Sequence, residues 1–194
     1  MKPTLLLFFA ILWLPLSSMG QQDKKLVETE MLRYLEAMET KDWTTVVNMV
    51  NPKYFLQVPK ELLMQVYRQM DNQQGLQISF LEPKITSIKK ELIHADTSYI
   101  PVDYSLIMQI RPAPELFDSE SELLDLFQGF EQSYQGQEVV FDRDSGLFYI
   151  DLKNTIIASS SGDRIYFLEY HAKDPFLEKI LPAQVLDRLK LGWN

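Results

Sequence analysis

The sequence predicts an α+β protein in which N-terminal helices pack on an antiparallel sheet and more helices follow at the C-terminus. Apolar residues recur at the helical spacing of three or four through residues 26–70. They then alternate with polar residues at the strand spacing of two over residues 76–111, and strand patterns return over 137–170. Helices grouped before and after runs of consecutive strands are typical of an α+β fold.

The first three predicted elements are helices. Residues 26–38 carry one apolar stripe, and Lys41-Asp42 interrupts it. Asp42 is placed to cap a short second helix, which Asn51-Pro52 ends. A third helix begins near Pro59 and ends in a turn at residues 72–75.

The next elements are strands. Residues 76–80 and 85–93 predict two strands, and residues 97–111 predict the longest one. The even-numbered residues from 100 to 110 of this longest strand are apolar and the odd-numbered ones mostly polar, which predicts a sheet with one covered face. Pro101 within it indicates an edge position or a bulge.

An acidic helical segment, residues 112–136, interrupts the strands, and Ser119 with Glu122 has the spacing of a capping box. Three strands follow at 137–141, 147–158 and 164–170. Both faces of 147–158 contain apolar residues, so its inward face stays open. Residues 174–191 form a helical extension whose apolar stripe predicts packing on the protein's own sheet, with docking on a partner as the alternative.

The N-terminus reads as a secretory signal peptide over residues 1–20. Lys2 precedes the apolar run Leu5–Leu16, and Ser18-Met19-Gly20 offers small residues for cleavage. The run is shorter than the ~20 residues of a membrane span, although a membrane anchor is the alternative interpretation. We expect residues 21–194 to form one exported domain, periplasmic or secreted, with no later transmembrane segment.

Composition excludes several kinds of site. The chain has 194 residues and no cysteine, which excludes disulfides, thiol catalysis and zinc–thiolate centres. Its only histidines, His94 and His171, are too few for a three-histidine metal site, and both are predicted to be exposed and inert. A net charge of −8 argues against nucleic-acid binding. Asp142-x-Asp144-x-Gly146 reads as a hairpin turn and not as a calcium loop, so we expect no metal and no cofactor.

Three segments resemble the nuclear transport factor 2-like superfamily, a cystatin-like α+β roll. They are Leu35-Glu36-Ala37-Met38 with Lys41-Asp42-Trp43, the strand pair from Ile85 to Met108, and Arg164-Ile165-Tyr166-Phe167. The resemblance covers residues 24–171 and implies a curved sheet that wraps the first helices and leaves a conical cleft. Members include ketosteroid isomerases, polyketide cyclases, dehydratases, transport adaptors and many exported proteins of unknown function. The fold therefore does not select an activity.

Five residues are candidates for lining such a cleft. Glu169 shares strand parity with Ile165 and Phe167, so it faces the core unless the strand ends and leaves it in solvent. Burial there would raise its pKa and suit it to acid–base work. The other candidates lie on apolar faces, and core packing is their alternative role. They are Tyr34, Met38, Tyr67 and Tyr104.

These residues lead to three functional hypotheses. The first is an exported, non-catalytic binding protein with an apolar and aromatic cleft for a small apolar molecule or a peptide. The second is an isomerase- or cyclase-type enzyme that uses a carboxylate, Glu169 or Asp103, and a tyrosine such as Tyr34. The third is an interaction module that forms a homodimer through the polar face of residues 97–111.

Overall fold

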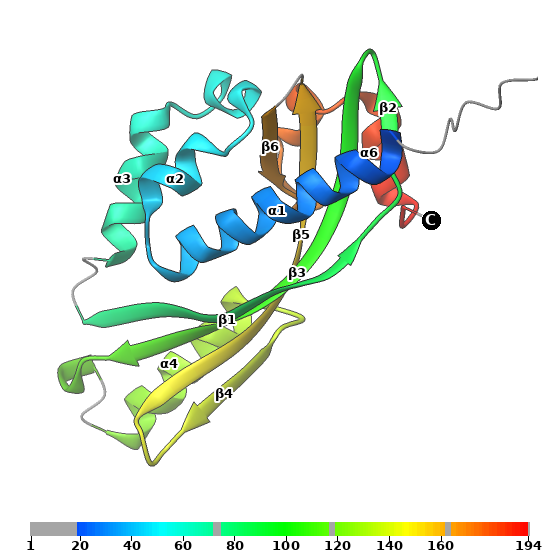
Figure 1. Cartoon of the computed structure of the whole chain (residues 1–194). Coiled ribbons are helices and arrows are strands. Elements are labelled where there is room, and N and C mark those ends of the chain that lie inside the picture. Colours follow the sequence, from blue (N-terminus) through cyan, green and yellow to red (C-terminus); the bar gives the residue numbers. More distant parts are fainter. Residues whose placement is uncertain (1–18, 72–74, 117–118, 162–163, 194) are drawn as a thin grey trace, which may run out of the picture.

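The computed structural model describes residues 19–71, 75–116, 119–161 and 164–193 (Figure 1). Most of the predicted signal peptide, most of the turn at 72–75 and residues 162–163 lie outside these ranges. The helices are α1 Met19–Glu39, α2 Trp43–Asn48, the 3-10 helix η1 Pro52–Leu56, α3 Lys60–Asp71, the 3-10 helix η2 Pro114–Leu116, α4 Glu120–Ser133, α5 Leu177–Ile180 and α6 Ala183–Lys190. The strands are β1 Leu76–Ile88, β2 Leu92–His94, β3 Thr97–Pro112, β4 Glu138–Asp142, β5 Leu147–Ser161 and β6 Arg164–Glu169.

Two predicted helix caps are confirmed. The Asp42 side chain accepts a hydrogen bond from the Thr45 backbone N–H at 3.1 Å and begins α2. Ser119 and Glu122 form a complete capping box at the start of α4. Both caps satisfy backbone N–H groups that have no partner within the helix.

The six strands form one open antiparallel sheet. Its order is β1-β3-β5-β4, with β2 also paired to β3 and β6 also paired to β5. The fold is therefore α+β, as predicted. In Figure 1, α1 crosses the sheet, α2 and α3 lie at one end of it, and α4 lies at the opposite end.

The strand boundaries differ from the prediction at the start of the sheet. Residues 76–88 form one strand instead of parts of two, because two bulges let β1 continue along β3. The first bulge contains Glu82, whose φ is +51°, and Pro83, which has no N–H to donate to the ladder. A bulge absorbs both irregularities without ending the strand.

Of the two interpretations of Pro101, an edge position or a bulge, the edge position was wrong. β3 pairs with β5 on one side and with β1 and β2 on the other, so it lies inside the sheet. Pro101 faces the interval between the end of β1 at Ile88 and the start of β2 at Leu92. The missing N–H falls where the neighbouring strand is interrupted, so the proline removes little from the ladder.

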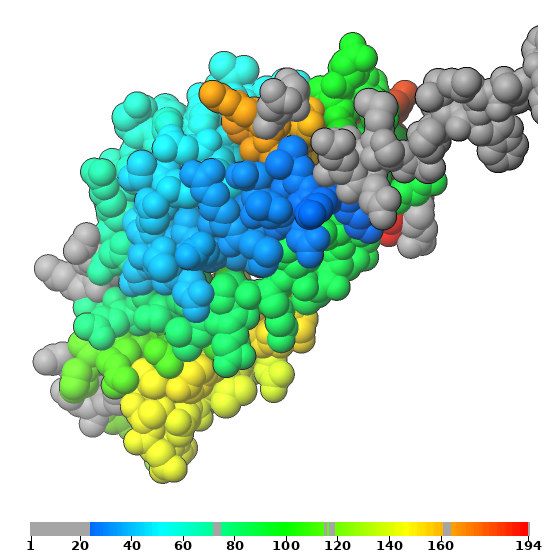
Figure 2. Space-filling view, in the orientation of Figure 1, coloured from blue at the N-terminus to red at the C-terminus, as the bar shows by residue number. Residues whose placement is uncertain are grey.

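The larger of two apolar clusters lies between the sheet and the first helices. α1 contributes Val27, Met31, Tyr34 and Leu35, and β3 contributes its even-numbered residues from 100 to 110. Phe148, Ile150 and Ile156 join them, so the even-numbered face of β5 points into this cluster. Figure 2 shows how α1 lies over this part of the sheet.

The second cluster lies on the other face, which contradicts the expectation of a single covered face. The C-terminal helices pack Leu177, Ile180 and Val185 against Tyr99 and Ile157. The tail therefore packs on its own sheet, as its apolar stripe predicted. No helix in the described ranges is both long enough and apolar enough to cross a lipid bilayer.

Candidate functional site

A carboxyl group lies buried at the end of β6. Glu169 pairs with Ile156 of β5 and shares a face with Ile165 and Phe167, which are in the larger cluster. The Tyr104 hydroxyl of β3 donates a hydrogen bond to Glu169 Oε1 at 2.6 Å. Glu169 Oε2 is buried and has no hydrogen-bond partner among the described residues. The carboxylate thus has one short hydrogen bond, from Tyr104 to Oε1, and weaker support from the Tyr34 hydroxyl.

Burial sets the charge of this carboxyl. Loss of hydration raises the pKa of Glu169 from its ordinary value of 4.5 to about 7, and the Tyr104 and Tyr34 hydroxyls partly offset this by stabilising the charged form. At neutral pH the group is therefore divided between the acid and the carboxylate. This is the protonation range that acid–base groups and pH-dependent binding sites need.

The surrounding tyrosines stay neutral. Burial raises the pKa values of Tyr34 and Tyr104 well above the ordinary 10, and nearby tyrosines and Glu169 raise them further. Burial, with a smaller contribution from Glu169, raises the pKa of Tyr67 to about 12. The three phenols near Glu169 are therefore neutral, and two of them, Tyr104 and Tyr34, donate hydrogen bonds to its carboxyl.

Packing fixes the rings of these tyrosines. Tyr34 lies against Phe167 with ring centroids 5.2 Å apart, and Tyr67 stacks on Trp43 at 4.8 Å. The Trp43 indole N–H donates to the Asp71 carboxylate, and this contact holds the indole in place. The hydroxyl positions are therefore set before any ligand arrives.

A cavity of about 200 Å³ opens beside the carboxyl. It lies between α1, the segment from η1 to α3, and the end of β6, and it is lined by Tyr34, Val50, Tyr54, Leu63, Tyr67, Phe167, Leu168, Glu169, His171 and Asp174. The Phe167 backbone N–H donates a hydrogen bond to the Met49 carbonyl at 2.7 Å, and the Phe167 carbonyl accepts one from the Asn51 N–H at 2.8 Å. These two hydrogen bonds connect the loop before η1 to β6.

Not all of the predicted residues meet here. Tyr34, Tyr67 and Glu169 line the cavity, and Tyr104 reaches Glu169 from β3. Met38 is half-buried against the larger cluster and does not line the cavity.

The other proposed carboxylate base lies elsewhere. Asp103 precedes Tyr104 on β3 and so points to the opposite face of the sheet. There it binds Lys89 Nζ at 2.7 Å and accepts a hydrogen bond from the Thr155 hydroxyl at 2.8 Å. It cannot act together with Tyr34 on one ligand.

Sequence reasoning missed three polar residues of the cavity. Tyr54 lies in η1, and His171 and Asp174 follow β6, where no periodic pattern assigns a side chain to a face. The proximity of Asp174 and His171 to Glu169 in the chain was the one available signal. His171 is exposed, as predicted, whereas His94 is half-buried and its Nδ1 lies 3.1 Å from the Gln184 side chain.

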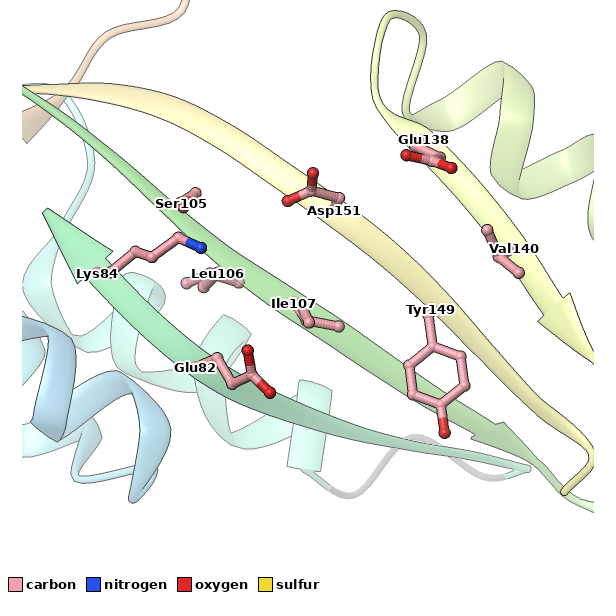
Figure 3. Close-up of a pocket in the computed structure, with 9 residues that line it drawn as sticks. All are labelled: Glu82, Lys84, Ser105, Leu106, Ile107, Glu138, Val140, Tyr149 and Asp151. Atoms are coloured by element: carbon pink, nitrogen blue, oxygen red, sulfur yellow. The ribbon is translucent and has the colours of Figure 1, made fainter. Parts of the chain in front are cut away.

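A second hollow, of about 340 Å³, lies on the outer face of the sheet (Figure 3). Glu82 and Lys84 of β1, Ser105 of β3, and Tyr149 and Asp151 of β5 contribute to it. Acidic and basic side chains are mixed on this open surface, and Asp151 is already paired with Lys153 at 2.8 Å. It lacks the convergence seen at Glu169, and the homodimer expected through this face stays a prediction.

Comparisons with known proteins add no assignment, since no family model and no curated protein matches the chain. The residues of the site are therefore the basis for inferring what the protein binds or catalyses. Within the described residues, no three histidine, aspartate or glutamate side chains are grouped to hold a metal ion. The Glu169 cavity offers an acceptor, several phenol donors and apolar walls. These groups suit the binding of a small molecule and the transfer of one proton.

Proposed function

We propose that this protein is an exported, non-catalytic binding protein that holds a small molecule in the cavity beside Glu169. The observation that carries the proposal is a cavity lined by Tyr34, Tyr54 and Tyr67 beside the buried Glu169 carboxyl, whose Oε2 has no close hydrogen bond among the described residues. We further propose that the sheet and first helices form a nuclear transport factor 2-like roll. The resemblance in sequence and the α+β order support that assignment.

The hydrogen bonding of the buried carboxyl favours a ligand that can donate to it. A buried polar atom without a hydrogen bond costs about 1–3 kcal/mol, and more when it carries charge. Tyr104 satisfies only Oε1. A molecule that brings positive charge or a donor toward the carboxyl recovers this cost upon binding.

The size of the cavity limits the ligand. An engineered apolar cavity of about 150 Å³ binds benzene. The Glu169 cavity, at about 200 Å³, has room for a body slightly larger than benzene. Val50, Leu63 and Leu168 supply apolar contacts for such a body.

A pair of tryptophan variants tests the proposal. Leu63 lines the cavity, so Leu63→Trp is expected to fill it. The control is Leu62→Trp, which adds the same side chain at the preceding residue of α3, where Leu62 is 49% exposed and does not line the cavity. Ligand-observed NMR is used to screen small cationic, neutral and anionic molecules of about this size against the purified wild-type protein. We expect some of these compounds to bind the wild type and the Leu62 variant but not the Leu63 variant. Equal binding to all three proteins, or to none, would refute the cavity as the site.

One observation favours a second candidate, an isomerase- or cyclase-type enzyme. Glu169 Oε1 lies 2.6 Å from a phenol oxygen and the carboxyl titrates near neutral pH, which suits a general base. The enzyme hypothesis also needs a phenol that donates to a substrate oxygen, and the Tyr104 hydroxyl already donates to the Glu169 carboxyl. We therefore rank binding first.

The enzyme hypothesis has its own test. A base at this position would catalyse exchange of the α-hydrogens of a small ketone such as cyclohexanone with deuterated water. NMR would measure the exchange rate with the wild type and with Glu169→Gln. Catalysis lost in the variant would establish the enzyme, and equal rates with and without the wild-type protein would exclude it for this substrate class.

A further inference from the structure

The charges around the cavity are one-sided. Two carboxylates, Glu169 and Asp174, line it, and no lysine or arginine does so among the described residues. Among the lining residues that the structure describes, His171 is the one able to carry positive charge, and it is exposed. The whole chain is also acidic, with a net charge of −8. An anion entering this cavity would meet repulsion from both carboxylates.

The aromatic walls have the same preference. The face of a tyrosine ring is electron-rich and attracts cations that lie within about 6 Å of its centre. Tyr34 and Tyr67 come from α1 and α3, and Tyr54 comes from η1, so the rings reach the cavity from three elements. Carboxylates combined with rings on several sides form the chemical surroundings that favour an ammonium group.

We propose that the ligand of this cavity is a small organic cation, an ammonium group carried on a short apolar or aromatic body. The inference rests on the proposed binding function and specifies its ligand class. The ammonium group lies among the tyrosine rings and compensates the charge of the Glu169 carboxylate, whose Oε2 has no close hydrogen bond among the described residues. The apolar body packs on Val50, Leu63 and Leu168.

Three molecules of nearly equal size and different charge test the ligand class. Benzylammonium is cationic, benzyl alcohol is neutral and benzoate is anionic. Calorimetry on the purified protein at pH 8 is expected to give an affinity for benzylammonium at least about tenfold above that for benzyl alcohol, since cation–π and charge-assisted contacts both contribute. Benzoate is expected not to bind.

The variant Glu169→Gln isolates the carboxylate. It is expected to lower the affinity for benzylammonium by about tenfold or more, because it removes the charge that faces the ammonium group. It is expected to lower the affinity for benzyl alcohol by less than that for benzylammonium, because a hydroxyl can still donate to the glutamine oxygen and loses no pairing of opposite charges. Asp187→Asn serves as the control for loss of one negative charge, since Asp187 lies on α6 away from the cavity.

The pH dependence gives an independent readout. Protonation of Glu169 below pH 7 removes its charge, so the affinity for benzylammonium is expected to fall by about tenfold from pH 8 to pH 6. Tyr34, Tyr67 and Tyr104 remain neutral over this range. The experiment is repeated in His171→Gln, which removes the histidine that lines the cavity and is expected to keep the fall.

The outcomes separate this inference from the binding function. If benzyl alcohol binds the wild type as tightly as benzylammonium and Leu63→Trp abolishes both, the cavity binds molecules but has no preference for cations. The inference on ligand class is then wrong and the binding function stands. The same holds if other compounds bind in the cavity and benzylammonium does not. If no compound binds in the cavity, both proposals are wrong.

Discussion

Replacement of Glu169 by glutamine provides a sensitive test of the buried carboxyl. Glutamine has almost the same shape, keeps an oxygen that accepts the Tyr104 hydrogen bond, and cannot ionise. The wild-type carboxyl ionises in the folded protein with a pKa of about 7, above the ordinary 4.5 that applies in the unfolded chain. The variant therefore removes one ionisation and little else.

The sign and size of the effect follow from this pKa difference. Between pH 4.5 and pH 7 the folded protein holds a proton on Glu169 that the unfolded chain has lost, so the free energy of unfolding falls as pH rises. At 1.36 kcal/mol per pKa unit, the full loss is about 3 kcal/mol and is complete above pH 7. Glu169→Gln is expected to abolish this loss and to be more stable than the wild type at pH 8.

Urea unfolding at several pH values from 4.5 to 8 measures the effect. The change in free energy of unfolding across this range is expected to differ between wild type and variant by about 3 kcal/mol. Glu28→Gln, on the exposed side of α1, is the matched control and is expected to follow the wild-type profile. Parallel profiles for the wild type and Glu169→Gln would show that the carboxyl is not buried as described.

Three further predictions concern the supports of the fold. Tyr104→Phe removes the donor to Glu169 Oε1 and is expected to lower the free energy of unfolding by about 1.5–3 kcal/mol at pH 8, but by less at pH 4.5 where the carboxyl is neutral, as urea titrations at both pH values will measure. Trp193→Ala is expected to lower the free energy of unfolding by about 3–5 kcal/mol, because Trp193 is 6% exposed within the second cluster. Its control is Leu191→Ala, which is expected to change that free energy by no more than about 0.5 kcal/mol, because Leu191 is 80% exposed. Equal shifts in melting temperature for the two variants would contradict this packing. Ser119→Ala removes the capping box of α4 and is expected to cost about 1 kcal/mol in the same assay, and no loss would show that this helix does not depend on its cap.

The sequence predicted the parts of the fold that depend on repeating patterns. Helical stripes placed α1 to α3, and capping residues marked the starts of α2 and α4. Strand parity placed Glu169 on the face of Phe167, and the buried carboxyl follows from that parity. Strand parity did not predict that Tyr104 would be the hydrogen-bond partner of Glu169, because the two residues are 65 positions apart in the sequence.

Other features depend on tertiary contacts that no local pattern encodes. The continuation of β1 through Glu82 and Pro83 requires β3 beside it to accommodate the bulge. The three polar cavity residues missed in the sequence lie in irregular segments, where backbone hydrogen bonds and not periodicity decide which way a side chain points. Tyr54, for example, is positioned by a loop that bonds the backbone of Phe167.

The two apolar clusters share the strands that separate them. Ile100, Ile156 and Phe167 enter the larger cluster, while their chain neighbours Tyr99, Ile157 and Leu168 enter the second. Their backbone amides are sealed from water on both sides and are expected to exchange hydrogen with solvent only through global unfolding. The strand that carries Glu169 therefore belongs to the most persistent unit of the molecule. A ligand entering the cavity meets a wall that stays fixed, and any adjustment falls on η1 and α3.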